Sequence, residues 1–257
     1  MYSPRTSIVR AVTFRVLTEL VRRHSNLPIR ILELHPTQSG YDCLTLWRDG
    51  ANGTFPGTVV AHFNTASENV TVFRPVVEPP TAGSALSDSM NYIDRYLLDP
   101  RSTLEILEEL CGFPSREAGR VPTSSRMVLV YRVISELLER SALSSRQLDV
   151  RSGWFDSDYD ECHVRPELRP FRGARAAFQP NLSREATAAI ASDFWMLSAC
   201  DALKTTHRTT PMAIDVSGKV WTPDRDDAVV DVWQLYSNNG RRLLPIVTEL
   251  ERITHAP

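Results

Sequence analysis

The residues best suited by type and spacing to do chemistry lie in one acidic stretch of the second half. Asp156, Asp158, Asp160 and Glu167 repeat the 1-3-5-12 spacing of the ligands in an EF-hand calcium loop. The sixth position of that loop must be glycine for its sharp turn, but Glu161 stands there. We therefore interpret the stretch as an acidic turn that leads into a strand. A hydrolase with an acidic metal site is the alternative.

A Tyr-Asp pair occurs once in each half of the chain, as Tyr41-Asp42 and as Tyr159-Asp160. A catalytic interpretation makes the aspartate a general base or a metal ligand. A structural interpretation has the aspartate accept hydrogen bonds from the N–H groups of a turn. We favour the structural interpretation, because catalytic residues tend to be lost from one copy of a duplication while packing residues persist in both.

No other pattern in the sequence predicts catalysis or cofactor binding. The sequence contains no P-loop, GxGxxG, GxSxG or HExxH motif, and its histidines show no ligand-like pairing. The four cysteines lie far apart without a CxxC pair, which is typical of reduced thiols in the cytoplasm. We predict no catalytic residue, no metal ligand and no cofactor, and we favour a protein that is not an enzyme.

An arginine-rich segment, 165–184, is the candidate partner-binding element. Arginine and aromatic residues are enriched at the energetic centres of protein interfaces. They also suit nucleic acid, where arginine contacts phosphate and aromatic rings stack on bases. We expect a protein partner, with nucleic acid and an ordinary solvated loop as the alternatives. The candidate contact residues are Arg165, Arg169, Phe171, Arg172, Arg175 and Phe178.

Composition excludes several classes of protein. The chain has 257 residues, is 42% hydrophobic and 23% charged, and carries a net charge of −2, as an ordinary soluble globular protein does. Near neutrality argues against a basic nucleic-acid module. No apolar run is long enough to span a membrane, so we expect a cytoplasmic protein. Arginine outnumbers lysine 27 to 2, which suggests a GC-rich, bacterial genome.

An internal repeat organises the chain. FRVLTELVRR at 14–23 matches YRVISELLER at 131–140, with identical residues at five of ten positions. Co-ordered matches of this kind indicate a duplication. Further matches follow in the same order: 32–34 with 148–150, 41–43 with 159–162, 70–75 with 219–223, and 96–110 with 236–250.

Each half is predicted to contain a long helix, about four short strands and a closing pair of helices. Apolar residues at helical spacing, Ile8, Val9, Val12, Val16, Leu17 and Leu20, define the buried stripe of the first helix. The predicted helices are 6–24, 84–98, 101–112, 124–141, 226–237 and 241–254. The predicted strands are 29–35, 41–48, 57–63, 69–74, 146–150, 158–164, 211–216 and 219–222.

We predict an α+β fold of two tandem pseudo-repeats, 1–115 and 122–257. The second repeat carries an insertion, 165–209, with a helix from a Ser183 cap to about residue 203. This architecture resembles small bacterial chaperone-like α+β modules. The resemblance concerns architecture alone. Our leading hypothesis, an intracellular, non-catalytic protein-interaction or adaptor module, rests on the duplicated scaffold, the lack of a nucleophile–base or metal motif and the near-neutral charge. The alternatives are a nucleic-acid-binding or processing component and the hydrolase named above.

Overall fold

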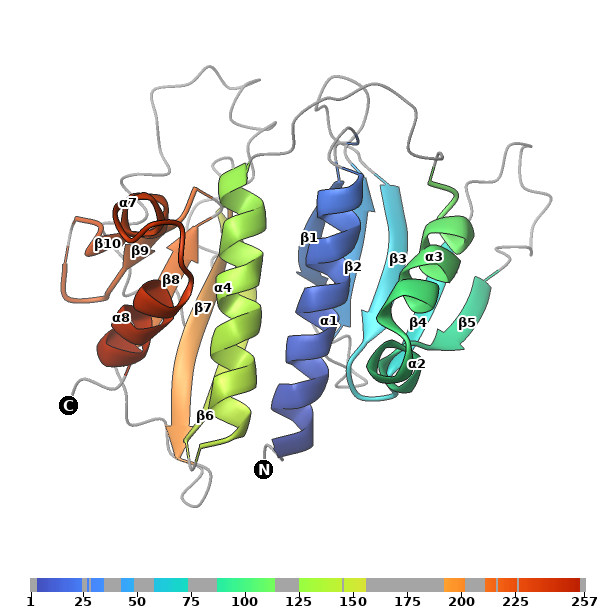
Figure 1. Cartoon of the computed structure of the whole chain (residues 1–257), viewed down its shortest axis with the longest axis horizontal. Coiled ribbons are helices and arrows are strands. Elements are labelled where there is room, and N and C mark those ends of the chain that lie inside the picture. The colour runs from blue at the N-terminus through green and yellow to red at the C-terminus, as the bar shows by residue number, and fades with distance from the viewer. Residues whose placement is uncertain are drawn as a thin grey trace. The chain divides into compact units, whose positions relative to one another are not determined.

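The computed structural model describes residues 4–24, 27, 29–34, 43–48, 58–73, 87–113, 125–144, 146–155, 192–201, 211–215, 217–225 and 227–254. The chain forms two compact units (Figure 1). One unit comprises Met1–Ala11 and Ser124–Pro257, and the other comprises Val12–Thr123. Helix α1 (Pro4–Arg23) therefore contributes its first residues to one unit and the rest to the other.

The unit Val12–Thr123 contains a five-stranded antiparallel sheet in which sequence neighbours pair in order. Short connections between antiparallel neighbours produce this simple meander. Its strands are β1 (Ile29–Leu34), β2 (Cys43–Arg48), β3 (Thr58–Asn64), β4 (Asn69–Phe73) and β5 (Ser87–Asn91).

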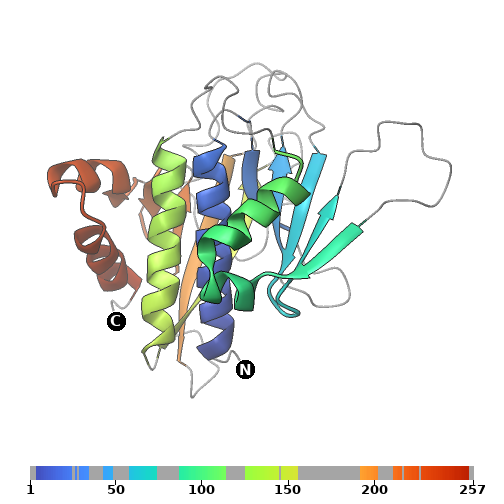
Figure 2. The ribbon, with the colours of Figure 1, turned by 45° about the vertical axis from the view of Figure 1, so that its right-hand side comes forward.

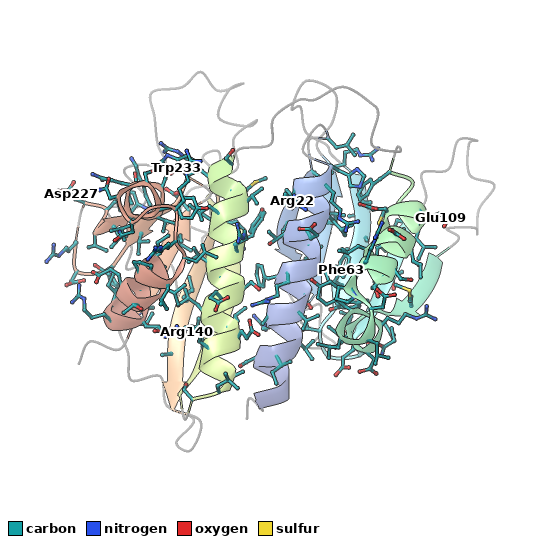
Figure 3. All side chains as sticks on the ribbon, viewed as in Figure 1. Arg22, Phe63, Glu109, Arg140, Asp227 and Trp233 are labelled. Atoms are coloured by element: carbon teal, nitrogen blue, oxygen red, sulfur yellow. The ribbon has the colours of Figure 1, made fainter. Side chains whose placement is uncertain are left out.

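Helices cover one face of this sheet. Helices α1 and α3 (Pro100–Leu110) lie on the same side of the strands, and α2 (Ile93–Leu98) precedes α3 (Figures 1 and 2). The Phe63 ring meets the Tyr92 ring edge-to-face at 5.1 Å in the core (Figure 3). The hydroxyl groups of Tyr92 and Thr13 are hydrogen-bonded at 2.6 Å, which ties the start of α2 to α1.

The other unit repeats the order of elements. Helix α4 (Ser125–Ala142) precedes a second five-stranded antiparallel meander, and α7 (Val232–Asn238) and α8 (Leu244–Thr254) close it. The strands are β6 (Arg146–Phe155), β7 (Ser192–Asp201), β8 (Met212–Asp215), β9 (Lys219–Trp221) and β10 (Val230–Asp231). The α+β class is thus confirmed.

The third-to-fourth-strand hairpins of the two sheets share one construction. The side chains of Asn64 and Asp215, at the ends of β3 and β8, accept hydrogen bonds from turn N–H groups. A residue with positive φ, Glu68 or Gly218, then precedes the next strand. The carbonyl of Glu68 accepts a hydrogen bond from the N–H of Tyr92 at 3.2 Å. The carbonyl of Gly218 accepts one from Val232 at 2.8 Å, so each turn meets the start of the following helix in the same way.

Three predicted helices are corrected by the structure. In the predicted helix 226–237, residues 230–231 form strand β10 and the helix begins only at Val232. Residues 87–91 of the predicted helix 84–98 form strand β5, so the sheet has a fifth strand. Residues 192–201 of the predicted helix 183–203 form β7, where Trp195, Leu197 and Ala199 are buried at alternate positions. Period two is the signature of a strand, and cross-strand burial here outweighs the helical spacing assigned to Ile190, Phe194 and Leu197.

The buried stripe predicted for the first helix holds with one exception. Its members from Val9 to Leu20 are buried, but Ile8 is 41% exposed and lies outside the core. The strands predicted at 29–35, 41–48, 57–63 and 69–74 agree with β1–β4 to within two residues at each end.

Strand order also bears on the proposed repeat alignment. In sequence order β2 corresponds to β7, so the extra residues of the second half lie at 156–191. The predicted insertion 165–209 is wrong in its bounds, because residues 192–201 form a strand of the sheet itself. The pairing of Tyr41 with Tyr159 does not follow this order, since Tyr159 precedes β7 by more than 30 residues. The predicted strand 158–164 and both Tyr-Asp pairs lie outside the described residues.

Candidate functional site

The arginine-rich segment, 165–184, lies outside the residues that the structure describes. Its candidate residues Arg165, Arg169, Phe171, Arg172, Arg175 and Phe178 lie outside the described residues, as do the acidic residues Asp156–Glu161 and Glu167. Within the part of the chain that the structure describes, no group of three or more His, Cys, Asp or Glu side chains is placed to hold a metal ion.

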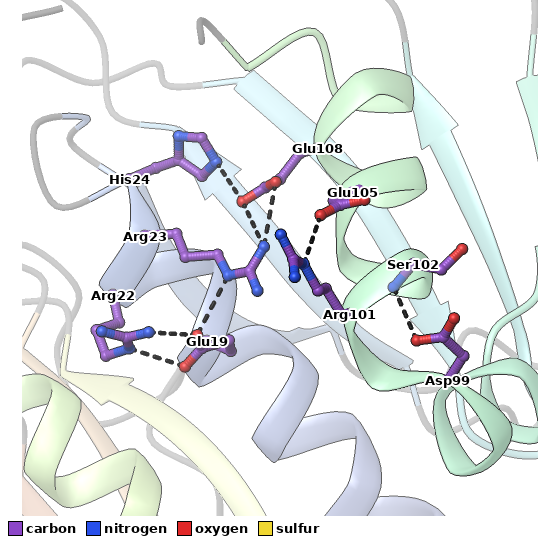
Figure 4. Close-up of polar contacts among 9 residues, drawn as sticks. All are labelled: Glu19, Arg22, Arg23, His24, Asp99, Arg101, Ser102, Glu105 and Glu108. Atoms are coloured by element: carbon purple, nitrogen blue, oxygen red, sulfur yellow. Dashed lines mark hydrogen bonds and ion pairs between the residues drawn. The ribbon is translucent and has the colours of Figure 1, made fainter. Parts of the chain in front are cut away.

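A polar network joins the end of α1 to α3 (Figure 4). The Arg23 guanidinium donates to Glu19 at 3.2 Å and to both carboxylate oxygens of Glu108 at 3.3 and 3.4 Å. The buried His24 ring forms a further hydrogen bond to Glu108 at 3.0 Å and packs on Phe113. Hydrogen bonds from Arg22 and Arg23 lower the pKa of Glu19 despite its partial burial. The network fixes the end of a helix and leaves its charges paired.

The second unit contains a matching connection. Arg140, which aligns with Arg23 in the repeat, donates to both carboxylate oxygens of Glu251 at 2.7 and 3.0 Å and so joins α4 to α8 (Figure 3). Each opening helix is thus tied by its last arginine to a glutamate on the closing helix. A feature retained in both units at equivalent places is best explained as structural.

The face of the first sheet opposite the helices presents a half-buried histidine. His62 Nδ1 is 2.9 Å from the hydroxyl of the buried Thr45, and its ring meets Phe73 edge-on at 4.7 Å. Burial lowers the pKa of His62. Burial between the strands thus disfavours the protonated form of the ring.

Strand β5 is the feature with clear capacity to bind another chain. It pairs with β4 over five residues without a register shift. One step beyond, the Tyr92 N–H donates to the Glu68 carbonyl. Because hydrogen-bonded positions alternate along an antiparallel pair, Met90 and Asp88 bond to β4. Ser87, Ser89 and Asn91 then turn their N–H and C=O groups to the outer side, where no strand pairs with them among the described residues.

Exposed apolar side chains follow this edge directly. Helix α2 begins at Ile93, separated from β5 by Tyr92 alone, and ends with Leu97 and Leu98, which are 59% and 87% exposed. Large exposed apolar side chains that lie together mark interaction surfaces more often than single ones do. The outer edge of β5 and the Leu97-Leu98 pair are therefore the candidate site, which we call the β5 edge and the α2 leucine pair.

These observations define an α+β interaction module in which antiparallel sheets carry helices on one face. The chain belongs to the TY-Chap2 family, described as "T3SS (YopN, CesT) and YbjN peptide-binding chaperone 2", whose match covers residues 11–253. No curated protein and no solved structure matches the chain.

The family confirms the prediction of a bacterial, chaperone-like protein-interaction or adaptor module, and it implies a protein partner. None of the described helices combines the length and the apolar character that crossing a membrane requires. The sequence pattern does not reveal the β5 edge, because it predicts a helix over 84–98. The run Ser-Asp-Ser at 87–89, followed by Asn91, is a poor helix former and was the available signal.

Proposed function

We propose that this protein is a chaperone that holds an extended peptide segment of a client protein by adding it as a strand to the β5 edge. The observation that carries the proposal is the outward row of three N–H and three C=O groups at Ser87, Ser89 and Asn91. Main-chain hydrogen bonds supply most of the affinity when a peptide extends a sheet in this way.

The character of β5 supports the proposal. Natural proteins protect exposed strand edges with bulges, prolines, charges or very short strands. Strand β5 has five residues in regular register, no proline, and one charged residue, Asp88, at a position bonded to β4. Within the part of the chain that the structure describes, nothing protects this edge, and an open edge is a liability for a protein that has no use for it.

A proline at an outward position tests the proposal. Ser89→Pro removes one outward N–H and adds a ring, but it leaves the β4–β5 hydrogen bonds intact, because edge strands accept proline where the N–H faces away. The probe is a fluorescein-labelled peptide of about 12 residues, roughly twice a usual strand length, selected from a random phage-displayed library against the wild-type protein. We expect Ser89→Pro to raise Kd at least about tenfold with little change in Tm.

Two controls accompany this variant. Ser89→Ala keeps the N–H and should bind as the wild type does, whereas Met90→Pro removes a bond to β4 and should lower Tm. Failure of the library to yield any binder, or unchanged affinity of a folded Ser89→Pro variant, would contradict the proposal.

The α2 leucine pair is proposed to contact apolar side chains of the same client segment. Leu98→Ser should weaken binding of the selected peptide without lowering Tm, because the side chain is 87% exposed. Leu143→Ser is the matched control, since Leu143 is 86% exposed but lies after α4 in the other unit. Equal loss of affinity in both variants would show that the effect is not specific to α2.

We also propose that the arginine-rich segment, 165–184, forms a second contact with the client. Shortening 166–182 to a Gly-Ser linker should leave Tm nearly unchanged and reduce capture of client protein. Nucleic acid is the alternative ligand, and it would show a steep loss of binding as salt is raised. Binding of a labelled single-stranded oligonucleotide at physiological salt would favour that alternative. We also propose a cytoplasmic location, to be checked by cell fractionation.

A further inference from the structure

The second sheet ends in β10, the strand that corresponds to β5 in strand order, but its edge is built differently. Strand β10 contains only Val230 and Asp231, paired with Val220 and Lys219. The N–H of Val229 also donates to the Val220 carbonyl at 2.8 Å, so two residues face one. That arrangement is a β-bulge, which interrupts a ladder and twists an edge away from a new strand.

Alternation leaves one outward position on β10. Val232 donates to the Gly218 carbonyl at 2.8 Å, one step beyond the paired residues, so Val230 also faces β9. Asp231 alone turns its main-chain groups outward. β5 has three such positions, and a single one cannot hold a peptide in a defined register.

Helix α7 closes the same position. Asp231 is its N-cap, with a carboxylate oxygen accepting a hydrogen bond from the Gln234 N–H at 3.0 Å. An incoming strand would meet a negative charge and the first turn of a helix. At β5 the helix α2 begins after Tyr92, beyond all three outward positions.

The long edge strand β6 is also occupied in part. The buried Arg10 guanidinium donates to the carbonyl of Val150 in the middle of that strand, within the same unit. A main-chain acceptor that is already bonded to arginine is not available to a peptide. Strand β1 carries charges at Arg30 and Glu33, two of its six positions, which is another protection of an edge.

We infer that the protein binds one client segment per chain although its fold has two similar units: the first sheet holds the peptide at β5, while in the second sheet the bulge and the Asp231 cap close the β10 edge and Arg10 occupies a main-chain acceptor in the middle of β6. This inference rests on the proposed function. It identifies the β5 edge as the element that sets stoichiometry.

Titration calorimetry and native mass spectrometry with the library-selected peptide test the inference. One peptide per wild-type chain is expected, and a ratio of two would overturn the inference while leaving the proposed function standing. Absence of binding to the wild type would instead overturn the proposed function.

A matched pair of variants separates the two edges. Asp231→Pro alters the only outward position of β10 and should lower Tm through loss of the cap, yet keep the ratio of one and a Kd within about twofold of wild type. Ser89→Pro should lose the single site. A folded Asp231→Pro variant that loses the peptide would overturn the inference. If the Asp231→Pro variant does not fold, the number of peptides bound per wild-type chain tests the inference by itself.

Discussion

At the scale of single residues, two leucines at equivalent places in the long helices illustrate what holds each unit together. Leu20 of α1 and Leu137 of α4 are both buried. Truncating either to alanine should lower the free energy of unfolding by about 2–5 kcal/mol, through lost burial and the cavity left behind. Urea denaturation measures the change. A loss below about 0.5 kcal/mol, the size of an ordinary surface effect, would show that the side chain is not in the core.

His62 makes stability depend on pH in a defined direction. Burial lowers its pKa from the ordinary 6.5, so the unfolded chain takes up a proton at a higher pH than the folded chain does. The contribution of His62 is therefore complete above pH 6.5 and is lost as the pH falls through the folded pKa. Urea denaturation across this range should show that His62→Gln flattens the wild-type decline. A steeper decline in the variant would contradict this sign.

At the scale of elements, the two hairpins give opposite expectations for glycine. Gly218 has φ +89°, and a Cβ there would lie 3.3 Å from Val232 Cβ and 3.6 Å from Val130 Cγ2. Gly218→Ala should destabilise the protein by about 1–3 kcal/mol.

Glu68 has φ 59° in the equivalent turn. Glu68→Gly should relieve about 1 kcal/mol of left-handed strain. Thermal denaturation compares the Tm of the Gly218→Ala and Glu68→Gly variants. An equal loss of stability in both variants would argue against equivalent turns.

Some elements could be predicted from the sequence and others could not, for physical reasons. The long helices α1 and α4 follow from apolar residues at helical spacing, which are buried in both helices. Strand β5 carries no such pattern, because its residues are mostly small and polar and it lies at a sheet edge. Strand β7 does alternate at Trp195, Leu197 and Ala199, but the same residues also fit part of a helical pattern.

The candidate site was harder to predict than the fold. Arginine and aromatic residues can be recognised in a sequence, so the sequence predicts a binding segment at 165–184. The β5 edge consists of main-chain groups whose direction depends on register with β4, and any residue type can supply those groups. No spacing of side chains could have revealed it. Only knowledge of strand order and of the Tyr92–Glu68 hydrogen bond defines which residues face outward.

At the scale of the whole molecule, we predict that 1–115 and 122–257 are copies of one ancestral unit. Three features support this prediction. The strand order is the same in both sheets, and their third-to-fourth-strand hairpins share one construction. Each unit also has an arginine–glutamate connection, Arg23–Glu108 in one and Arg140–Glu251 in the other. In an experimental structure, superposing β1–β5 on β6–β10 should bring Arg15 over Arg132. A shift of α1 by a full turn relative to α4 would contradict the duplication.

The division of α1 has a consequence for synthesis on the ribosome. Its first residues, through Ala11, belong to the unit completed by residues 124–257. The carbonyl partner of Arg10 is Val150, which is translated 140 residues later, and Ala11 accepts a hydrogen bond from Ser135. The unit Val12–Thr123 can close while translation continues, but Arg10 and Ala11 must wait until α4 and β6 have been translated. Cutting the gene between the repeats would therefore separate the N-terminal turns of α1 from the residues that bury them.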